Sequence, residues 1–448
     1  MKIHFYGGSH EVTGSCYLIE TEKSKIVLDC GMFQGSDFNE GKNHEDFPFD
    51  PRDINAVLVS HAHLDHTGRI PKLVKDGYQG KIYMTKATVE LSRLIWDDAY
   101  QIMEYNNRKF QQPLLFFPQD IAEASMQCHG VDYQETISVG DCRIKFHDAG
   151  HIFGSAFIEI QAEGKTVLFS GDLGNVDAPI IQDTEKLPAI DVLLCESTYG
   201  NRIHESSAQR DQMLLSVIQE GFARGGTIMI PAFSLERTQE LLYKLHDMSE
   251  HDHTLPNIPI YLDSPLAIRA LKVYKKYKEY YDEGANEHQG SDDFLEFPQL
   301  HITLTREESK AINHTRGPKI VIAGSGMMNG GRIVHHAYRY LSDPNSTLLI
   351  VGYQAQGTLG RRLYEGAEKV KIFGDEIQVH CKVKAIGALS AHADQQKLLQ
   401  WIRDAKRRPK KVYCVHGEPD AATALAHKIR DEFGIDAFVP ERGEVVEV

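Results

Sequence analysis

Histidine and aspartate residues gather in one short segment of this sequence, His61-Ala-His63-Leu-Asp65-His66. The segment follows an apolar run, residues 56–60, that predicts a β-strand, and it precedes a helix-like segment. Alternation along the strand direction places His61 and His63 on the same side, while Asp65 and His66 follow where the chain turns into the helix. Imidazole nitrogen and carboxylate oxygen atoms are ligands of Zn²⁺. The spacing therefore predicts two neighbouring metal ions.

Three later residues at the ends of predicted strands supply the remaining ligands, namely His151, Asp172 and His416. Taken singly, they could be a hydrogen-bonded core histidine, a turn residue and a surface loop residue. Taken with the first motif, they complete a set for two Zn²⁺ ions per chain. We expect one ion to be held by His61, His63 and His151, the other by Asp65, His66 and His416, and Asp172 to bridge them.

The elements that must position these side chains fall into two patterns. Short β-branched runs and one helix-like stretch, residues 88–112, fill the first two hundred residues and predict mixed sheet and helix. From about Ser206, strands alternate with helix-length amphipathic segments, which predicts a parallel sheet covered by helices. Short β-rich runs return from about Lys371. We therefore divide the chain into a first domain, its inserted domain and a continuation of the first, at residues 1–205, 206–372 and 373–448.

Composition limits the class of protein. The chain has 448 residues, enough for two folding units, with 42% hydrophobic and 25% charged residues, as in a packed soluble protein. No apolar run is long enough for a signal peptide or a membrane span, so we expect a cytoplasmic protein that does not enter a membrane.

The seven cysteines include no C-x-x-C pair and are expected to be reduced. Polar residues 283–297 predict an exposed loop.

The formal net charge of −14 argues against broad non-specific affinity for polyanions, although it does not exclude a local basic groove. Basic clusters occur at residues 269–278, 361–362 and 406–411, and a solvated helix face is the simpler interpretation of most of them. The 22 histidines are the more unusual feature, and they indicate metal or acid–base chemistry.

The ordered ligand set resembles that of the metallo-β-lactamase superfamily, whose signature is H-x-H-x-D-H followed by spaced His, Asp and His ligands. The resemblance implies that Asp29, at the end of the run Lys25-Ile-Val-Leu-Asp29, is a carboxylate that orients the histidine-bearing loop. Considered alone, Asp29 would be just a turn residue.

Three further motifs resemble those of the β-CASP ribonucleases, the group that includes the polyadenylation-factor endonuclease. They are Glu196 in Cys195-Glu-Ser-Thr-Tyr-Gly, His392 in Ala388-Leu-Ser-Ala-His-Ala-Asp, and His416 before Gly-Glu. The resemblance implies an α/β protein, a metallo-β-lactamase αββα sandwich with an inserted parallel α/β β-CASP domain. Histidine in the third motif resembles the RNA-cleaving branch, in a stand-alone bacterial or archaeal form.

Asp65, Glu196 and His392 are the predicted catalytic residues. His392 lies outside the ligand set and is the candidate general acid for the leaving 3′ oxygen. Glu196 could hydrogen-bond His392, fix its tautomer and raise its pKa. The alternative is that His392 is a structural histidine at a helix start and Glu196 a loop carboxylate.

The inserted domain is expected to bind substrate through glycine-rich and hydroxyl-bearing turns at helix starts, where backbone amides can accept a phosphate. Tight turns used only for packing are the alternative for each. The candidate residues are Ser234, Arg237, Ser264, Ser325, Gly326, Arg332, Gln356, Thr358 and Arg361. We assign no role to His251, His253, His335 and His336.

The predicted function is a zinc-dependent ribonuclease, acting as an endonuclease, a 5′-exonuclease or both on single-stranded RNA that enters between the two domains. A homodimer or a larger processing complex is a compatible assembly. The alternative is a small-molecule hydrolase of the thioester or lactam kind, which would use the same ligands but does not need the insertion, Glu196 or His392. A non-catalytic scaffold subunit predicts broken metal motifs, whereas every ligand is present here.

Overall fold

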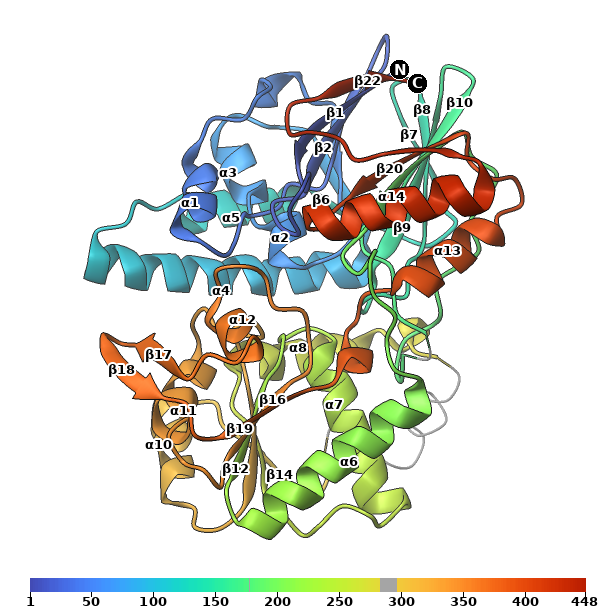
Figure 1. The fold of residues 1–448 in the computed structure, drawn as a ribbon. Helices are drawn as coiled ribbons and strands as arrows, with labels where there is room; N and C mark the ends of the chain where they lie inside the picture. Colours follow the sequence, from blue (N-terminus) through green and yellow to red (C-terminus); the bar gives the residue numbers. More distant parts are fainter. Residues whose placement is uncertain (177, 283–295) are drawn as a thin grey trace. The chain divides into compact units, whose positions relative to one another are not determined.

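The chain folds into two compact units. The structure is a computed structural model that describes residues 1–176, 178–282 and 296–448 (Figure 1). The first unit comprises residues 1–176, 182–203 and 392–448, and the second comprises residues 177–181 and 204–391. The loop predicted at residues 283–297 lies, except for its last two residues, outside the described part of the chain.

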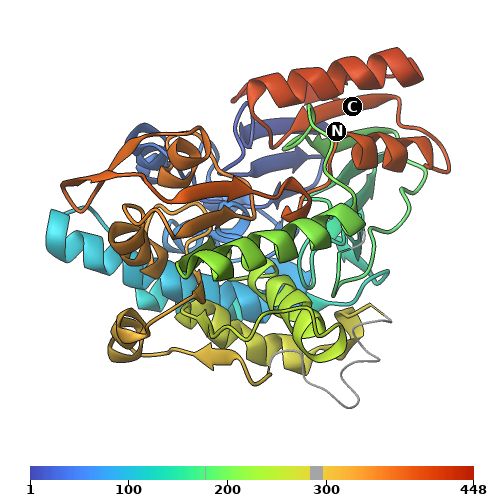
Figure 2. The ribbon, with the colours of Figure 1, turned by 60° about the horizontal axis from the view of Figure 1, so that its bottom comes forward.

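Two seven-stranded mixed sheets form the centre of the first unit. The order of the first sheet is β22 (Val445–Glu447), β1 (Lys2–Gly7), β2 (Cys16–Glu20), β3 (Lys25–Leu28), β4 (Ala56–Leu58), β5 (Lys81–Thr85) and β6 (Cys128–Val131). The order of the second is β21 (Asp436–Phe438), β20 (Lys411–Val415), β11 (Val192–Glu196), β10 (Lys165–Phe169), β9 (Ala156–Ala162), β8 (Cys142–Asp148) and β7 (Thr136–Val139). Because β1 pairs with β22, the two ends of the chain meet, and Val448 N donates to Met1 O at 3.0 Å (Figures 1 and 2).

The two sheets pack face to face through one apolar core. Ile3, Tyr17 and Leu28 from the first sheet are buried with Phe146 and Ile158 from the second. Strand β1 alternates exposed or half-buried positions with buried ones, which is the pattern of a strand with one face toward solvent. All five residues of β11 are buried, because it is a central strand covered on both faces.

Helices cover the outer face of each sheet and complete an αββα sandwich, as the sequence predicts (Figure 1). Trp96 of helix α4 (Lys86–Phe110) packs with Val57 on the first sheet, together with α3 (Ile70–Lys75) and α5 (Pro118–Gln127). Leu398 of α13 (Gln395–Arg403) and Leu425 of α14 (Pro419–Phe433) pack with Leu193 on the second. The short helices are α1 (Asp37–Gly41), α2 (Leu64–Thr67), η1 (Lys42–His44) and η2 (Pro51–Asp53).

A six-stranded parallel sheet forms the centre of the second unit, as the strand–helix alternation predicts. Its order is β14 (Leu300–Ile302), β13 (Ile260–Leu262), β15 (Lys319–Ala323), β12 (Thr227–Pro231), β16 (Thr347–Ile350) and β19 (Lys382–Ala385). Strands β17 (Lys369–Ile372) and β18 (Asp375–Gln378) form a separate antiparallel pair.

Helices pack on both faces of this sheet. Ile333 of α11 (Arg332–Tyr340) packs with Met229 on one face. Gly221 of α6 (Ser207–Arg224) lies against Ile228, which points to the opposite face because side chains alternate along a strand. Among the described residues, the other helical segments of this unit are α7 (Arg237–His246), η3 (Asp247–His251), α8 (Pro265–Lys276), η4 (Lys278–Tyr280), α10 (Arg306–Ala311), η5 (Ile312–His314), α12 (Leu359–Tyr364) and η6 (Gly387–Leu389).

The second junction between the units lies later in the chain than the sequence-based division at residues 372 and 373. The units separate between residues 391 and 392, because β19 pairs in parallel with β16 and so extends the sheet of the second unit. The β-rich runs that begin near Lys371 therefore belong first to the second unit. Among the described residues, no helix is both long and apolar enough to cross a membrane.

Candidate metal centre

The predicted ligands lie at one edge of the second sheet and at the end of one strand of the first. Strand β9 is antiparallel to both β8 and β10, while β10, β11 and β20 are mutually parallel. The carboxyl ends of β8, β10, β11 and β20 therefore share an edge, and the chain continues from them to His151, Asp172 and His416, with Glu196 as the last residue of β11. Ligand sites form at such strand ends because loops from several strands converge there.

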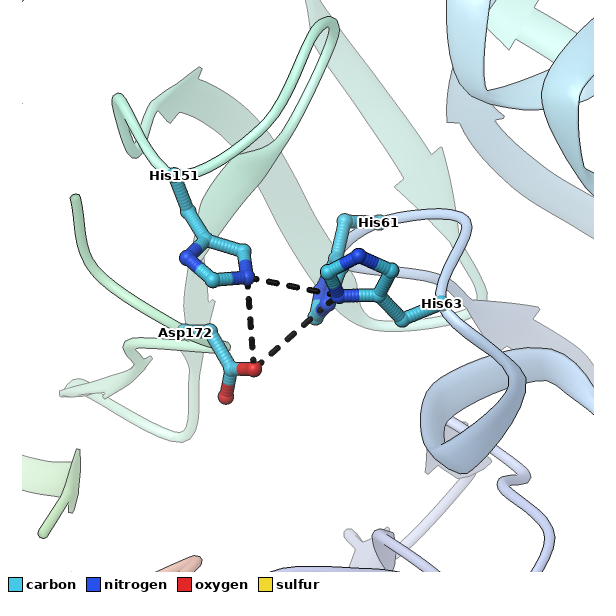
Figure 3. Close-up of side chains that lie close together, drawn as sticks. All are labelled: His61, His63, His151 and Asp172. Atoms are coloured by element: carbon cyan, nitrogen blue, oxygen red, sulfur yellow. Dashed lines mark hydrogen bonds and ion pairs between the residues drawn. The ribbon is translucent and has the colours of Figure 1, made fainter. Parts of the chain in front are cut away.

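The first group of side chains contains His61, His63, His151 and Asp172, and Figure 3 shows their rings and carboxylate turned toward one another. His61 Nε2 lies 3.0 Å from His63 Nδ1, which lies 3.4 Å from His151 Nε2. Asp172 Oδ2 lies 3.5 Å from His61 Nε2 and 3.6 Å from His151 Nε2.

The second group contains Asp65, His66 and His416. His66 Nε2 lies 3.3 Å from His416 Nε2, which lies 3.6 Å from Asp65 Oδ2. Asp172 Oδ2 is also 3.3 Å from His66 Nε2, so this one oxygen atom borders both groups. Its other oxygen, Oδ1, lies 3.3 Å from His416 Nδ1.

These spacings fit the binding of a metal ion. Four ligand atoms arranged tetrahedrally about Zn²⁺ at 2.0–2.1 Å lie roughly 3.3 Å apart. The ligand-atom distances given above run from 3.0 to 3.6 Å. Neutral imidazole nitrogens that face each other at this distance through their lone pairs repel, whereas a cation between them attracts both.

Charges and burial keep the first group of histidines neutral. Burial lowers the pKa of His61 and His151 well below the ordinary value, and neighbouring histidines lower it further. Burial lowers the pKa of His63 to about 4. His66 differs, because the carboxylates of Asp172 and Asp29 outweigh its burial and raise its pKa well above the ordinary value.

Asp29 and Ser60 orient the ring of His66. Asp29 Oδ2 accepts the Nδ1 proton of His66 at 2.6 Å, which leaves Nε2 directed at Asp172 and His416. The other Asp29 oxygen accepts from Ser60 N at 2.7 Å, and the Ser60 hydroxyl donates to Oδ2 at 2.7 Å. Ser60 Oγ also lies 3.0 Å from His61 Nδ1. The family resemblance implied that Asp29 lies beside the histidine-bearing loop, where the structure places it. Ser60 was not singled out, although its place directly before His61 was an available signal.

Two glycines allow the ligand-bearing loops to approach closely. A Cβ atom on Gly31 would lie 1.5 Å from the carbonyl oxygen of Asp65, and one on Gly174 would lie 1.6 Å from that of Gly150. Any side chain at either position would therefore push a ligand loop away. Neither glycine was predicted from the sequence, because such contacts join segments that are distant along the chain.

His392 and Glu196 lie beside the two groups without belonging to them. His392 Nδ1 is 3.3 Å from Glu196 Oε2 and 3.8 Å from Asp172 Oδ2. Burial opposes a charge on His392, but Glu196 and then Asp172 outweigh it, so the pKa of His392 is raised. Glu196 is fully buried, and its Oε1 accepts from Leu173 N at 2.5 Å. The structure thus brings together the pair that the sequence predicted.

Thr198 was not singled out from the sequence. Its hydroxyl oxygen lies 3.2 Å from His416 Nδ1.

The hydroxyl-bearing turns of the second unit come together in part. Ser234 Oγ lies 3.2 Å from Ser264 Oγ, and a Cβ on Gly324 would be 3.4 Å from each. Ser264 caps helix α8 by accepting from Ala267 N. The remaining candidates have these surroundings: Ser325 donates to Gly330 O at 3.2 Å, Gly326 O accepts from Gln354 Nε2 at 2.9 Å, Gln356 is exposed, and Thr358 is buried and donates to Ala355 O at 2.7 Å.

The three candidate arginines are engaged within the unit. Arg237 is buried and pairs with Glu240, while Arg361 Nε donates to Glu365 at 2.6 Å. Arg332 donates to Asp263 Oδ1 at 2.6 Å. Asp263, buried at the end of β13, also bonds His336 Nε2 at 2.7 Å. His336 has no role in the sequence-based predictions, and Asp263 is not among the predicted site residues, although an acid directly after a buried strand was an available signal for it.

Comparison with known proteins places these observations in a family. The metallo-beta-lactamase superfamily model matches residues 11–208, the Beta-Casp domain model matches residues 238–363, and the model described as a Zn-dependent metallo-hydrolase RNA specificity domain matches residues 376–440. The third match extends across the junction between the two units.

Named relatives align along nearly the whole chain. Ribonuclease TTHA0252 of Thermus thermophilus is 41% identical and covers 95% of each chain. An RNase J-like protein of Methanocaldococcus jannaschii is 31% identical over 100% of this chain and 99% of its own. Transcription termination factor FttA of Methanosarcina mazei is 30% identical over 97% of this chain and 70% of its own. A solved structure of a protein of unknown function from Enterococcus faecalis V583 has a TM-score of 0.54 at 14% identity over 100% of this chain and 99% of its own, a likeness of fold.

Proposed function

The chain belongs to the β-CASP family of the metallo-β-lactamase superfamily, and from this membership we propose that it is a ribonuclease that uses two Zn²⁺ ions to hydrolyse phosphodiester bonds of single-stranded RNA. The observation that carries the proposal is the position of Asp172 Oδ2 between two groups of ligand atoms, 3.3 Å from His66 Nε2 and 3.5 Å from His61 Nε2. In this proposal His61, His63 and His151 would hold one ion, Asp65, His66 and His416 would hold the other, and the carboxylate of Asp172 would be shared by both.

Two cations bound by these residues would supply a water molecule activated at neutral pH and would stabilise the charge on the phosphate oxygens. Addition of water to phosphorus breaks the bond to the 3′ oxygen, which must then take up a proton. Nδ1 of His392 faces Glu196, so its Nε2 is the nitrogen that remains to donate this proton. Glu196 holds the His392 ring in orientation and is itself held by Leu173 N. The products are a 5′-phosphate and a 3′-hydroxyl end.

RNA as the substrate class is supported by the RNA specificity match at residues 376–440 and by relatives named as ribonucleases. In the second unit, we propose that the hydroxyls of Ser234, Ser264 and Ser325 and the backbone near Gly326, Gln356 and Thr358 contact the RNA backbone. Arg237, Arg332 and Arg361 are committed to carboxylates, so we assign them the role of holding these turns in place. A thioester or lactam hydrolase would use the same ligands but would not need Glu196 and His392.

The decisive experiment follows single-stranded RNA labelled at its 5′ end on a gel, with purified protein in Zn²⁺ and after chelation. We expect Zn²⁺-dependent cleavage that His392→Ala abolishes while its bound zinc remains. His427→Ala changes an exposed histidine on α14 and serves as the matched control, with wild-type activity expected. Fragment sizes distinguish internal from 5′-terminal cleavage.

Intact RNA under these conditions, together with zinc-dependent turnover of a thioester or lactam, would exclude the ribonuclease. Full activity of His392→Ala would leave the ribonuclease in place and remove His392 from the proposed proton transfer.

A further inference from the structure

We propose that the second unit carries a separate binding site for a divalent transition-metal ion of the Zn²⁺ class, formed by His246, Asp247 and His251 at the end of helix α7. One ligand atom from each of these three residues lies within 4.8 Å of the others. The site does not depend on the proposed ribonuclease function, because none of its residues belongs to the candidate metal centre.

The backbone explains why the two histidines face each other. In an α-helix, residues five apart are rotated by roughly 140° about the axis and do not share a face. Here α7 continues into a π-helix over Asp247–His251, and Asp252 N donates to Asp247 O, five residues back, at 2.9 Å. The wider turn brings the ring centroids of His246 and His251 to 5.3 Å. Local π-helical turns frequently occur at functional sites.

Burial gives the three residues different parts in the site. His246 is only 1% exposed and packs edge to face against Phe297, at 5.7 Å between ring centroids. Asp247 is half-buried and His251 is exposed. One ligand is therefore held by the core while the site stays open to solvent, and three protein ligands plus water satisfy the usual coordination of an open zinc site.

The local charge favours a cation. Residues 246–253 contain Asp247, Glu250 and Asp252 but no lysine or arginine. The carboxyl end of a helix carries partial negative charge, and here the helix formed by α7 and η3 ends at His251. The nearest preceding cation along the chain, Lys244, pairs with Asp211 at 3.0 Å. Two imidazoles with one carboxylate select Zn²⁺, Ni²⁺ or Co²⁺ over Mg²⁺ or Ca²⁺, which prefer all-oxygen sites.

His253 belongs to the same histidine-containing segment and provides a matched control. Its Nδ1 contacts Ser249 O at 2.9 Å, and it lies outside the group of three. Like His251, it is exposed, so either side chain can be truncated without opening a cavity.

The test is equilibrium dialysis of the full chain against a series of buffered free Zn²⁺ concentrations, with bound zinc measured by atomic emission. Wild type and His253→Ala are expected to bind one more equivalent of zinc than His251→Ala and Asp247→Asn, with all four proteins equally folded by circular dichroism. The readout is stoichiometry, so it is independent of cleavage activity.

Equal zinc uptake by wild type and His251→Ala at every concentration would overturn the site. Loss of an equivalent in His253→Ala would overturn the ligand set. An extra equivalent that responds to His251→Ala but not to Asp247→Asn would exclude the carboxylate as a ligand and contradict the site as proposed.

Discussion

At the scale of the residue, substitution of Asp29 measures how much one buried carboxylate contributes to zinc affinity at the candidate metal centre. Its φ of +55° lies in the left-handed region, which asparagine tolerates, so Asp29→Asn keeps the backbone and the size of the side chain. The change weakens the hold on the Nδ1 proton of His66 at 2.6 Å. We expect roughly 10–100-fold weaker zinc affinity. Competition with a chromophoric chelator measures it.

The control for this substitution is Asp53→Asn, which changes an exposed carboxylate paired with Lys25 at 3.2 Å and should bind zinc as wild type does. Unchanged zinc affinity in Asp29→Asn would show that Ser60 and the packing of the loop are sufficient to orient His66.

Asp263 carries a prediction about pH at the same scale. Hydrogen bonds from His336, Ser309, Thr303 and Arg332 outweigh its burial and lower its pKa to about 2. A lowered pKa means that the carboxylate stabilises the fold above its unfolded pKa near 3.9, and that this contribution is lost as the pH falls toward 2. Asp263→Asn should therefore lower the free energy of unfolding by on the order of 3 kcal/mol at pH 7, because the buried groups that bind the carboxylate lose their charged partner.

Urea unfolding of wild type and Asp263→Asn at a series of pH values measures this difference. The difference between the two proteins in free energy of unfolding should become smaller below pH 4, since protonation then removes the charge from Asp263 in wild type as well. A gap that does not change with pH would mean that hydrogen-bond geometry, and not the charge of Asp263, stabilises the unit.

At the scale of the element, the start of helix α4 supports the loop that carries His151. Thr85 caps the helix by accepting from Thr88 N, and its hydroxyl donates to Gly154 O at 2.6 Å. Thr85→Ala should lower the free energy of unfolding by about 1–2 kcal/mol through loss of the cap. It should also lower zinc occupancy, because the loop loses its anchor. Denaturant unfolding and zinc content measure the two effects.

Thr305→Ala is the matched control, because Thr305 caps the exposed helix α10 of the second unit by the same kind of bond. We expect a loss of stability there without loss of zinc from the candidate metal centre. If zinc content were the same in Thr85→Ala and wild type, the loop of His151 would be held by its own contacts alone.

At the scale of the whole molecule, the two units should respond differently to removal of metal. The facing nitrogens and carboxylates of the candidate metal centre all belong to the first unit. An ion present at a thousand times its dissociation constant contributes about 4 kcal/mol to the folded state. Chelation should therefore speed hydrogen exchange in β4, β11 and β20, while β12 and β15 of the second unit keep their protection.

Hydrogen exchange followed by mass spectrometry resolves these strands. Equal loss of protection in the strands of both units would show that the units unfold together. No change in either unit would show that bound metal does not stabilise the fold.

Much of this architecture follows from local patterns. The strand–helix alternation predicted from about Ser206 is one example: the continuous apolar runs at residues 227–231 and 319–323 form β12 and β15 over their whole length. Strand β1 was not predicted, because His4 and Tyr6 stand on its half-exposed side and dilute the apolar signal. The junction near residue 391 was also missed, because β19 alternates exposed and half-buried residues and only its pairing with β16 assigns it to the second unit.

The sequence by itself determined which ligand types are present, in which order, and that they follow strands, because these properties are written within a few residues of each motif. The tertiary structure decided which atoms meet. His66 and His416 are 350 residues apart, and their Nε2 atoms lie 3.3 Å from each other only because β4 and β20 belong to sheets packed on one core. The same holds for the arginines of the second unit. Their sequence pattern predicted phosphate contacts, but the tertiary structure places Arg332 in a hydrogen bond with Asp263. Side-chain partners across the fold depend on contacts that no local pattern specifies.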